Sequence, residues 1–151
     1  MSSALLQLFF LLLLIIPVAF YLMTLQRTLQ VIIPENRRMP PWQVWLLLIP
    51  FFNLIWQFVV VNKISHSIRR ECERLNISTI QEKPTFDLGN IQSLLFIAGF
   101  MPKIGFFFAF CGIICWIIYW VQVAKYQSIF IENKDNDLLD AERELLHTGN
   151  R

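Results

Sequence analysis

The chain has 151 residues, of which 56% are hydrophobic, 15% are aromatic and only 16% are charged. Soluble domains carry about a quarter charged residues, so this composition argues against a soluble domain. The formal net charge of +2 is too small to favour nucleic acid as a partner, and three cysteines do not make a disulfide framework.

Charge-poor stretches predict an all-α integral membrane protein, built as a four-helix transmembrane bundle. A hydrocarbon core about 30 Å thick needs roughly 20 apolar residues of helix. The predicted transmembrane domain covers residues 1–131, with a polar tail at 132–151. Its four predicted spans cover residues 5–25, 42–61, 88–101 and 104–124. The third is short, about 21 Å at 1.5 Å per residue, so whether 88–101 fully crosses stays open.

The first apolar run, 5–25, reads as a retained span rather than a secretory signal. No basic residue precedes it, and it is longer than the 7–15 apolar residues of a signal peptide. The connector at 34–41 contains three prolines, which interrupt a helix.

The segment after the second span is polar but keeps a helical pattern. Ile64, Ile68, Cys72 and Leu75 recur at one-turn and two-turn spacings, and most charged residues lie elsewhere around the helix. This pattern predicts an amphipathic helix at 62–76, either projecting from the second span or lying on the membrane surface. A loop is expected at 77–87.

The distribution of Lys and Arg predicts the orientation of the chain. With four spans, both tails and the 62–87 segment share one side, which holds nine Lys and Arg residues. The opposite side, which includes the 34–41 connector, holds four. Because cytoplasmic loops are enriched in Lys and Arg, we expect both termini and 62–87 to be cytoplasmic.

Polar residues form two stripes within the apolar runs. Asn53 and Gln57 share one face of the second span, and Tyr119 and Gln122 share one face of the fourth. An amide facing lipid would leave its polar atoms unpaired, so both stripes should face protein. They are interpreted either as interhelical hydrogen bonds or as an intramembrane polar seam that binds a small ligand or ion.

A second candidate surface is expected on the cytoplasmic side. The 62–76 helix is basic, with Arg69 and Arg70, whereas residues 136–146 form a short acidic helix with Leu138 and Leu145 on one side. Complementary charge favours a contact between the two that a partner shares or displaces. The alternative is a solvated tail.

Two segments, Pro50-Phe51-Phe52-Asn53-Leu54-Ile55-Trp56-Gln57 and the run from Trp116 to Tyr126, carry a family resemblance. They resemble small four-span bacterial membrane proteins classed as a domain of unknown function, over residues 40–127. The resemblance implies the bacterial cytoplasmic membrane and a four-helix bundle, and it implies no activity.

The sequence holds no catalytic grouping, phosphate-binding loop or metal-ligand pattern, and no Asp, Glu, Arg or His lies deep in a predicted span. We therefore expect a non-enzymatic protein without a cofactor, a structural or accessory interaction subunit of a membrane complex. Its expected partners are membrane lipids and other membrane proteins, as a homo- or hetero-oligomer. The alternative is a small oligomeric channel or transporter.

Overall fold

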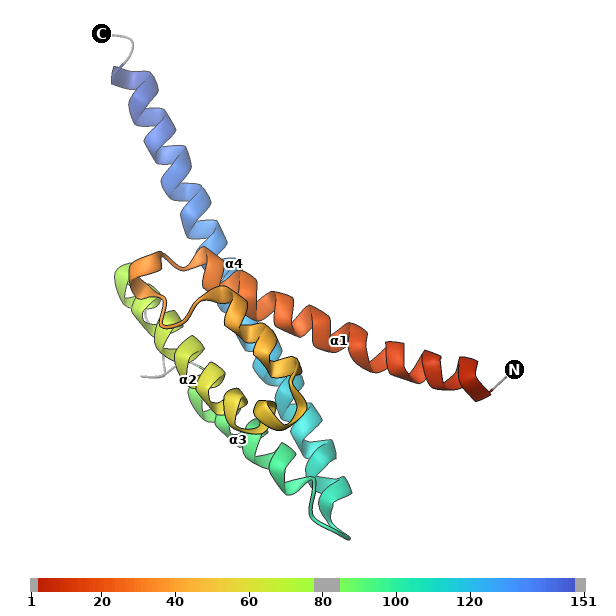
Figure 1. The fold of residues 1–151 in the computed structure, drawn as a ribbon. Coiled ribbons are helices and arrows are strands. Elements are labelled where there is room, and N and C mark those ends of the chain that lie inside the picture. Colours follow the sequence, from red (N-terminus) through yellow and green to blue (C-terminus); the bar gives the residue numbers. More distant parts are fainter. Residues whose placement is uncertain (1–2, 78–84, 149–151) are drawn as a thin grey trace.

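The computed structural model describes residues 3–77 and 85–148, and that part of the chain is helical, with no strand (Figure 1). The helices are α1 (Ser3–Val31), η1 (Pro34–Asn36), η2 (Pro41–Leu48), α2 (Pro50–Arg74), α3 (Phe86–Ala98) and α4 (Gly105–Thr148). The predicted all-α class is confirmed.

The hydrophobic core lies where the second half of α1 meets α2, η2 and α4. Its most deeply buried apolar side chains are Leu22, Leu25, Leu29, Ile32, Val44, Val60, Val61, Ile64, Ile68, Tyr119 and Val123. Gly89 lets α3 approach α2 and α4 closely. A methyl group there would lie 2.5 Å from Val61 Cγ1 of α2 and 2.8 Å from Tyr119 Cε2 of α4.

The prediction of one continuous helix over 42–61 is wrong. The chain forms the 3₁₀ helix η2 up to Leu48, is extended at Ile49 (φ −81°, ψ 111°), and begins α2 at Pro50. Pro50 has no N–H to give to the preceding turn, and it disfavours helical backbone at Ile49. The chain reverses there, and Trp56 Nε1 on α2 donates to the Gln43 carbonyl on η2 at 3.0 Å. The two elements therefore form an antiparallel hairpin.

The amphipathic segment 62–76 is the second half of α2, because α2 runs without a break from Pro50 to Arg74. Ile64, Ile68 and Cys72 are buried in the core. The segment therefore continues the preceding helix and packs into the core of the bundle.

The placement of the 34–41 connector across the membrane from 62–87 is also wrong. Asn36 Nδ2 donates to Glu71 Oε2 at 2.8 Å, and the Arg38 backbone N–H donates to Ser67 Oγ at 2.9 Å. Segments joined by hydrogen bonds lie at one end of the molecule. The alternating count of sides assumed that every apolar run crosses, whereas the η2–α2 hairpin returns to the end at which it began.

The predicted separate helix at 136–146 is part of α4, which is 44 residues long, about 66 Å at 1.5 Å per residue. Among the described residues, Gly105–Leu146 is the one stretch whose length and composition are sufficient to cross a membrane. Only 17% of its most apolar window is buried against the rest of the chain.

Two helical ends project from the bundle in Figure 1. The apolar arm is the start of α1, residues 3–14, where Leu5, Phe9, Leu12 and Leu13 are exposed. The polar arm is the end of α4, residues 132–148.

Candidate functional site

A polar cluster lies inside the bundle, with one member from each of four helices. Tyr21 of α1, Gln57 of α2, Gln92 of α3 and Tyr119 of α4 are all buried. Gln57 Nε2 donates to the Tyr21 hydroxyl at 3.3 Å, and the rings of Tyr21 and Tyr119 meet edge to face with centroids 6.3 Å apart. The cluster therefore joins helices that are distant in sequence.

Not every polar atom of this region is paired. Within the described part of the chain, Thr85 Oγ1, Gln92 Oε1 and the Tyr119 hydroxyl are buried without a hydrogen-bond partner. An unpaired buried polar group costs about 1–3 kcal/mol. Thr85 also adopts left-handed backbone (φ 67°), which is uncommon for a β-branched residue. Such unpaired groups are suited to a bound water or a small polar ligand.

Two of the four residues of the predicted polar seam lie in this cluster. Gln57 and Tyr119 lie in the buried cluster, whereas Asn53 and Gln122 are half-buried outside the set of fully buried polar residues. Sequence reasoning missed Tyr21 and Gln92. The available signal was a polar residue within a charge-free apolar run, which both of them are.

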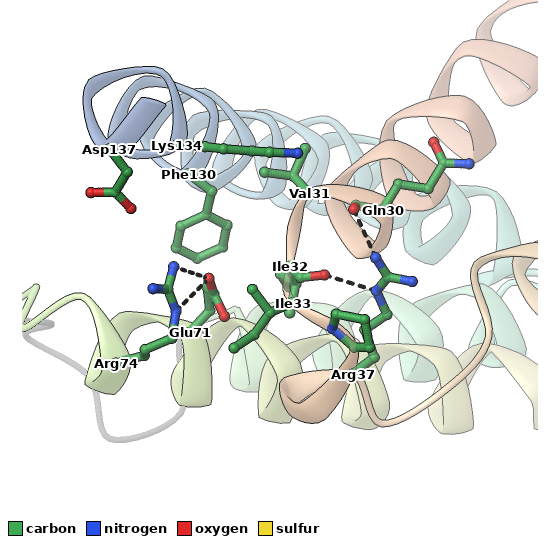
Figure 2. Close-up of a pocket in the computed structure, with 11 residues that line it drawn as sticks. Gln30, Val31, Ile32, Ile33, Arg37, Glu71, Arg74, Phe130, Lys134 and Asp137 are labelled. Carbon is green, nitrogen blue, oxygen red and sulfur yellow. Dashed lines mark hydrogen bonds and ion pairs between the residues drawn. The ribbon is translucent and has the colours of Figure 1, made fainter. Parts of the chain in front are cut away.

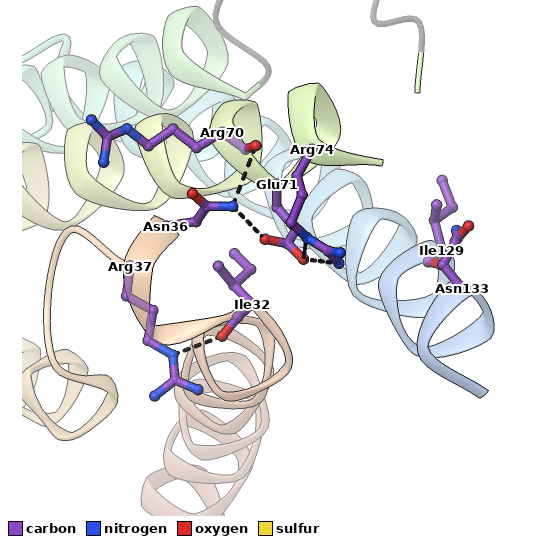
Figure 3. Close-up of polar contacts among 8 residues, drawn as sticks. All are labelled: Ile32, Asn36, Arg37, Arg70, Glu71, Arg74, Ile129 and Asn133. Carbon is purple, nitrogen blue, oxygen red and sulfur yellow. Dashed lines mark hydrogen bonds and ion pairs between the residues drawn. The ribbon is translucent and has the colours of Figure 1, made fainter. Parts of the chain in front are cut away.

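A second polar group lies at the end of α2, around the buried carboxylate of Glu71, whose side chain is 2% exposed (Figure 3). Arg74 donates to Glu71 Oε1 from Nε at 3.0 Å and from Nη2 at 2.7 Å, while Asn36 donates to Oε2. These bonds raise the pKa of the Arg74 guanidinium. Both carboxylate oxygens are thus satisfied, and the contact ties the connector to α2.

Arg37 caps the carbonyl groups at the C-terminal end of α1. Its Nε donates to the Ile32 carbonyl at 2.8 Å and its Nη2 donates to the Gln30 carbonyl at 2.9 Å (Figures 2 and 3). The last carbonyls of a helix lack partners within the helix and carry partial negative charge, so a cation is favourable there.

The ends of α1 and α2 and the middle of α4 enclose a pocket of about 230 Å³ (Figure 2). Its charged lining residues are Arg37, Glu71, Arg74, Lys134 and Asp137, and Phe130 of α4 lies among them. The neighbouring Cys72 is buried, and this burial, with the charges of Glu71 and Glu73, raises the pKa of its thiol to about 11.

The predicted cytoplasmic contact residues are not brought together. Arg69 pairs with Glu73 on its own helix at 2.7 Å, and Arg70 is half-buried. Leu138 and Leu145 are 61% and 72% exposed. The part of α4 that packs in the hydrophobic core lies earlier and includes Tyr126 and Phe130. The 62–76 and 136–146 segments approach each other at Arg74 and Asp137, beside the pocket, and not at the four predicted contact residues.

Comparison of the chain with protein-family models, with curated proteins and with solved structures found no match.

Proposed function

We propose that this chain is a non-enzymatic, multi-pass membrane protein that serves as a structural or accessory interaction subunit of a membrane complex. The observation that carries the proposal is the division of α4. Its first part presents Phe106, Phe107 and Phe110 outward, each more than half exposed, and its last part is charged. A helix of this kind is stable when lipid surrounds one half and water surrounds the other.

The proposed transmembrane part extends from the α4 segment to its neighbours. Exposed apolar side chains also cover α1 and the tip of the η2–α2 hairpin, where Phe51 and Ile55 are 90% and 73% exposed. In this arrangement α1 and α4 cross the bilayer. The η2–α2 hairpin enters and leaves at one side, and α3, about 20 Å long at 13 residues, packs between α2 and α4 without a full crossing of its own.

Basic residues support an orientation for this arrangement. Of the described Lys and Arg residues, Lys103 alone lies at the α3–α4 turn, and the rest lie toward the end of the molecule that holds Glu71. By the positive-inside rule that end is cytoplasmic, and the polar arm extends into the cytoplasm. The apolar arm then starts from the opposite side, which replaces the expectation that both termini share the cytoplasm. The bacterial cytoplasmic membrane, implied by the family resemblance, is the proposed location.

The interaction role rests on the polar arm. Leu138 and Leu145 are seven residues apart, so they share one helix face, and the bundle leaves both exposed. We expect a photo-reactive amino acid at either position to cross-link to one defined membrane partner in cells. The same group at Asp140, on the opposite face, serves as the matched control. Equal labelling at all three positions, or none, would mean that the arm is a solvated tail.

The buried polar cluster favours the alternative, a small oligomeric channel or transporter. Its test replaces Gln57 with Leu, with Asn53→Leu as the control outside the cluster. An interhelical hydrogen bond in a membrane is worth about 0.6 kcal/mol, so a structural role predicts only a small fall in thermal stability in detergent. Loss of solute flux in proteoliposomes at unchanged stability would favour the transport function instead.

A further inference from the structure

The pocket between α1, α2 and α4 lies where α4 changes from apolar to charged. Ile131 is the last residue of the apolar run Ile129–Ile131, and Glu132 follows it. Val31 and Ile32, at the end of α1, line the pocket together with Phe130. In a membrane-embedded protein this boundary is the headgroup region, where lipid phosphates lie above the hydrocarbon chains.

Two cations lie on one side of this pocket. Arg37 uses Nε and Nη2 to cap α1, and its third nitrogen, Nη1, can donate to an added acceptor. Lys134 is exposed, and its side chain extends along α4 toward Val31, on the Arg37 side of the pocket (Figure 2).

The acidic groups lie on the other side. Glu71 is paired with Arg74, and Asp137 lies beside Arg74, with Phe130 between this group and Lys134 (Figure 2). Three cations and two anions give the lining a formal charge of +1. That charge is complementary to a singly charged phosphodiester.

The size and lining of the pocket also fit part of a lipid. At about 230 Å³ it lies below the roughly 300 Å³ at which pockets for drug-sized ligands begin, so it can hold a headgroup phosphate but not a whole lipid. Val31, Ile32, Ile33 and Phe130 give it apolar walls, which a free hydrated phosphate would not use.

We propose that this pocket binds the phosphodiester of an anionic membrane lipid, held by Arg37 and Lys134, with the glycerol against Val31 and Phe130. The inference rests on the proposed membrane location. Its consequence is that an anionic lipid bridges α1 and α4, and thereby stabilises the end of the bundle from which the polar arm projects.

The test compares two lysines of α4 in the full-length protein. The protein is reconstituted into nanodiscs of phosphatidylcholine with and without phosphatidylglycerol, and lipid retention is measured by native mass spectrometry. Lys134→Ala removes a pocket cation. Lys125→Ala removes an exposed cation nine residues earlier, which at 100° per residue lies on the opposite face of α4.

We expect Lys134→Ala to weaken phosphatidylglycerol retention about tenfold, the effect of losing one charge-assisted hydrogen bond, and Lys125→Ala to leave it unchanged. Arg37→Lys keeps the charge but loses the planar fork, and should weaken retention while the protein still folds. Inorganic phosphate added to phosphatidylcholine nanodiscs should leave the melting temperature unchanged.

If Lys134→Ala and Lys125→Ala lost phosphatidylglycerol retention equally, general surface charge would explain the binding and the inference would be overturned. If inorganic phosphate raised the melting temperature as much as phosphatidylglycerol does, the pocket would be a site for a free anion instead of a lipid. A protein that enters nanodiscs without preferring phosphatidylglycerol would contradict this inference alone. A protein that fails to enter them would contradict the proposed membrane function as well.

Discussion

The apolar arm at the start of α1 and the polar arm at the end of α4 both project from one bundle (Figure 1). Their side chains are comparably exposed, 48% at Leu12 and 61% at Leu138. Their charges differ completely, with none in residues 3–14 and eight in residues 132–146. Equal exposure therefore requires different surroundings. The proposed membrane function supplies both surroundings, because it places lipid around the uncharged, leucine-rich arm and water around the charged one.

The net charge of the polar arm adds to this contrast. Residues 132–146 hold six acidic and two basic residues, a formal charge of −4. Anionic lipids at a cytoplasmic membrane surface would repel this charge. The arm is therefore expected to extend away from the surface rather than lie along it, which keeps Leu138 and Leu145 accessible.

The largest predicted effect comes from placing the same charge on each arm. Leu12→Arg should lower membrane integration, because Leu to Arg at the centre of a span costs about 3 kcal/mol on insertion scales. Leu138→Arg should leave integration unchanged. The measurement is the fraction of protein that stays with membranes after alkaline carbonate extraction. Equal membrane retention of the two variants would contradict the different surroundings assigned to the two arms.

A smaller effect is predicted in the bundle from which both arms project. Gly89→Ala should destabilise the protein by about 1–3 kcal/mol, because the added methyl group meets Val61 and Tyr119 in a packed core. Gly112→Ala is the matched control, since its methyl group would meet the movable ring of Phe96 at 3.3 Å. Thermal unfolding in detergent measures both, and equal stabilities would contradict the packing described for α3.

The partly buried ion pair near the end of α2 should contribute more to stability than the exposed ion pair near the end of α4. Glu71→Ala should cost about 1–2 kcal/mol, because Asn36 and the partly exposed Arg74 lose a buried acceptor. Asp140→Ala, which breaks the exposed pair with Arg143, should leave the unfolding midpoint unchanged. A larger loss from Asp140→Ala than from Glu71→Ala would reverse the assignment of the polar arm as solvated.

The smallest effect is expected from shortening the polar arm. Deleting residues 139–151 should leave both the melting temperature and the protease sensitivity of α2 unchanged, because Leu145 is 72% exposed. A contact between the 136–146 segment and the 62–76 helix, which their complementary charges favour, predicts faster cleavage of α2 after the deletion. Limited proteolysis followed by mass spectrometry distinguishes the two.

Sequence patterns predicted the helices more reliably than their arrangement. The apolar runs at 5–25 and 88–101 correspond closely to α1 and α3, because a long uncharged run of good helix formers has few alternatives. The break at Ile49 was readable from Pro50, which lies inside the predicted 42–61 span. The continuity of α4 was readable too, since neither Pro nor Gly occurs from Ile113 to Thr148.

Long-range pairing was not readable in the same way. Nothing local in the sequence links Asn36 to Glu71, or Tyr21 to Gln57, because these contacts depend on the reversal at Ile49 and on how helices dock. Two members of the buried polar cluster, Gln57 and Tyr119, were predicted from their helical spacing. The other two, Tyr21 and Gln92, lie on α1 and α3 and were missed.

The central claim is that the connector, the end of α2 and the polar arm share one side of the membrane, with the α3–α4 turn on the other. It is tested by cysteine accessibility in a variant whose three native cysteines are replaced by alanine. Glu35→Cys, Glu73→Cys, Asp140→Cys and Lys103→Cys each add one thiol at an exposed position, which an impermeant maleimide labels from one side at a time. We expect the first three to react from the cytoplasmic side and Lys103→Cys from the opposite side. Labelling of Glu35→Cys from the same side as Lys103→Cys would restore the alternating four-span count and contradict the account.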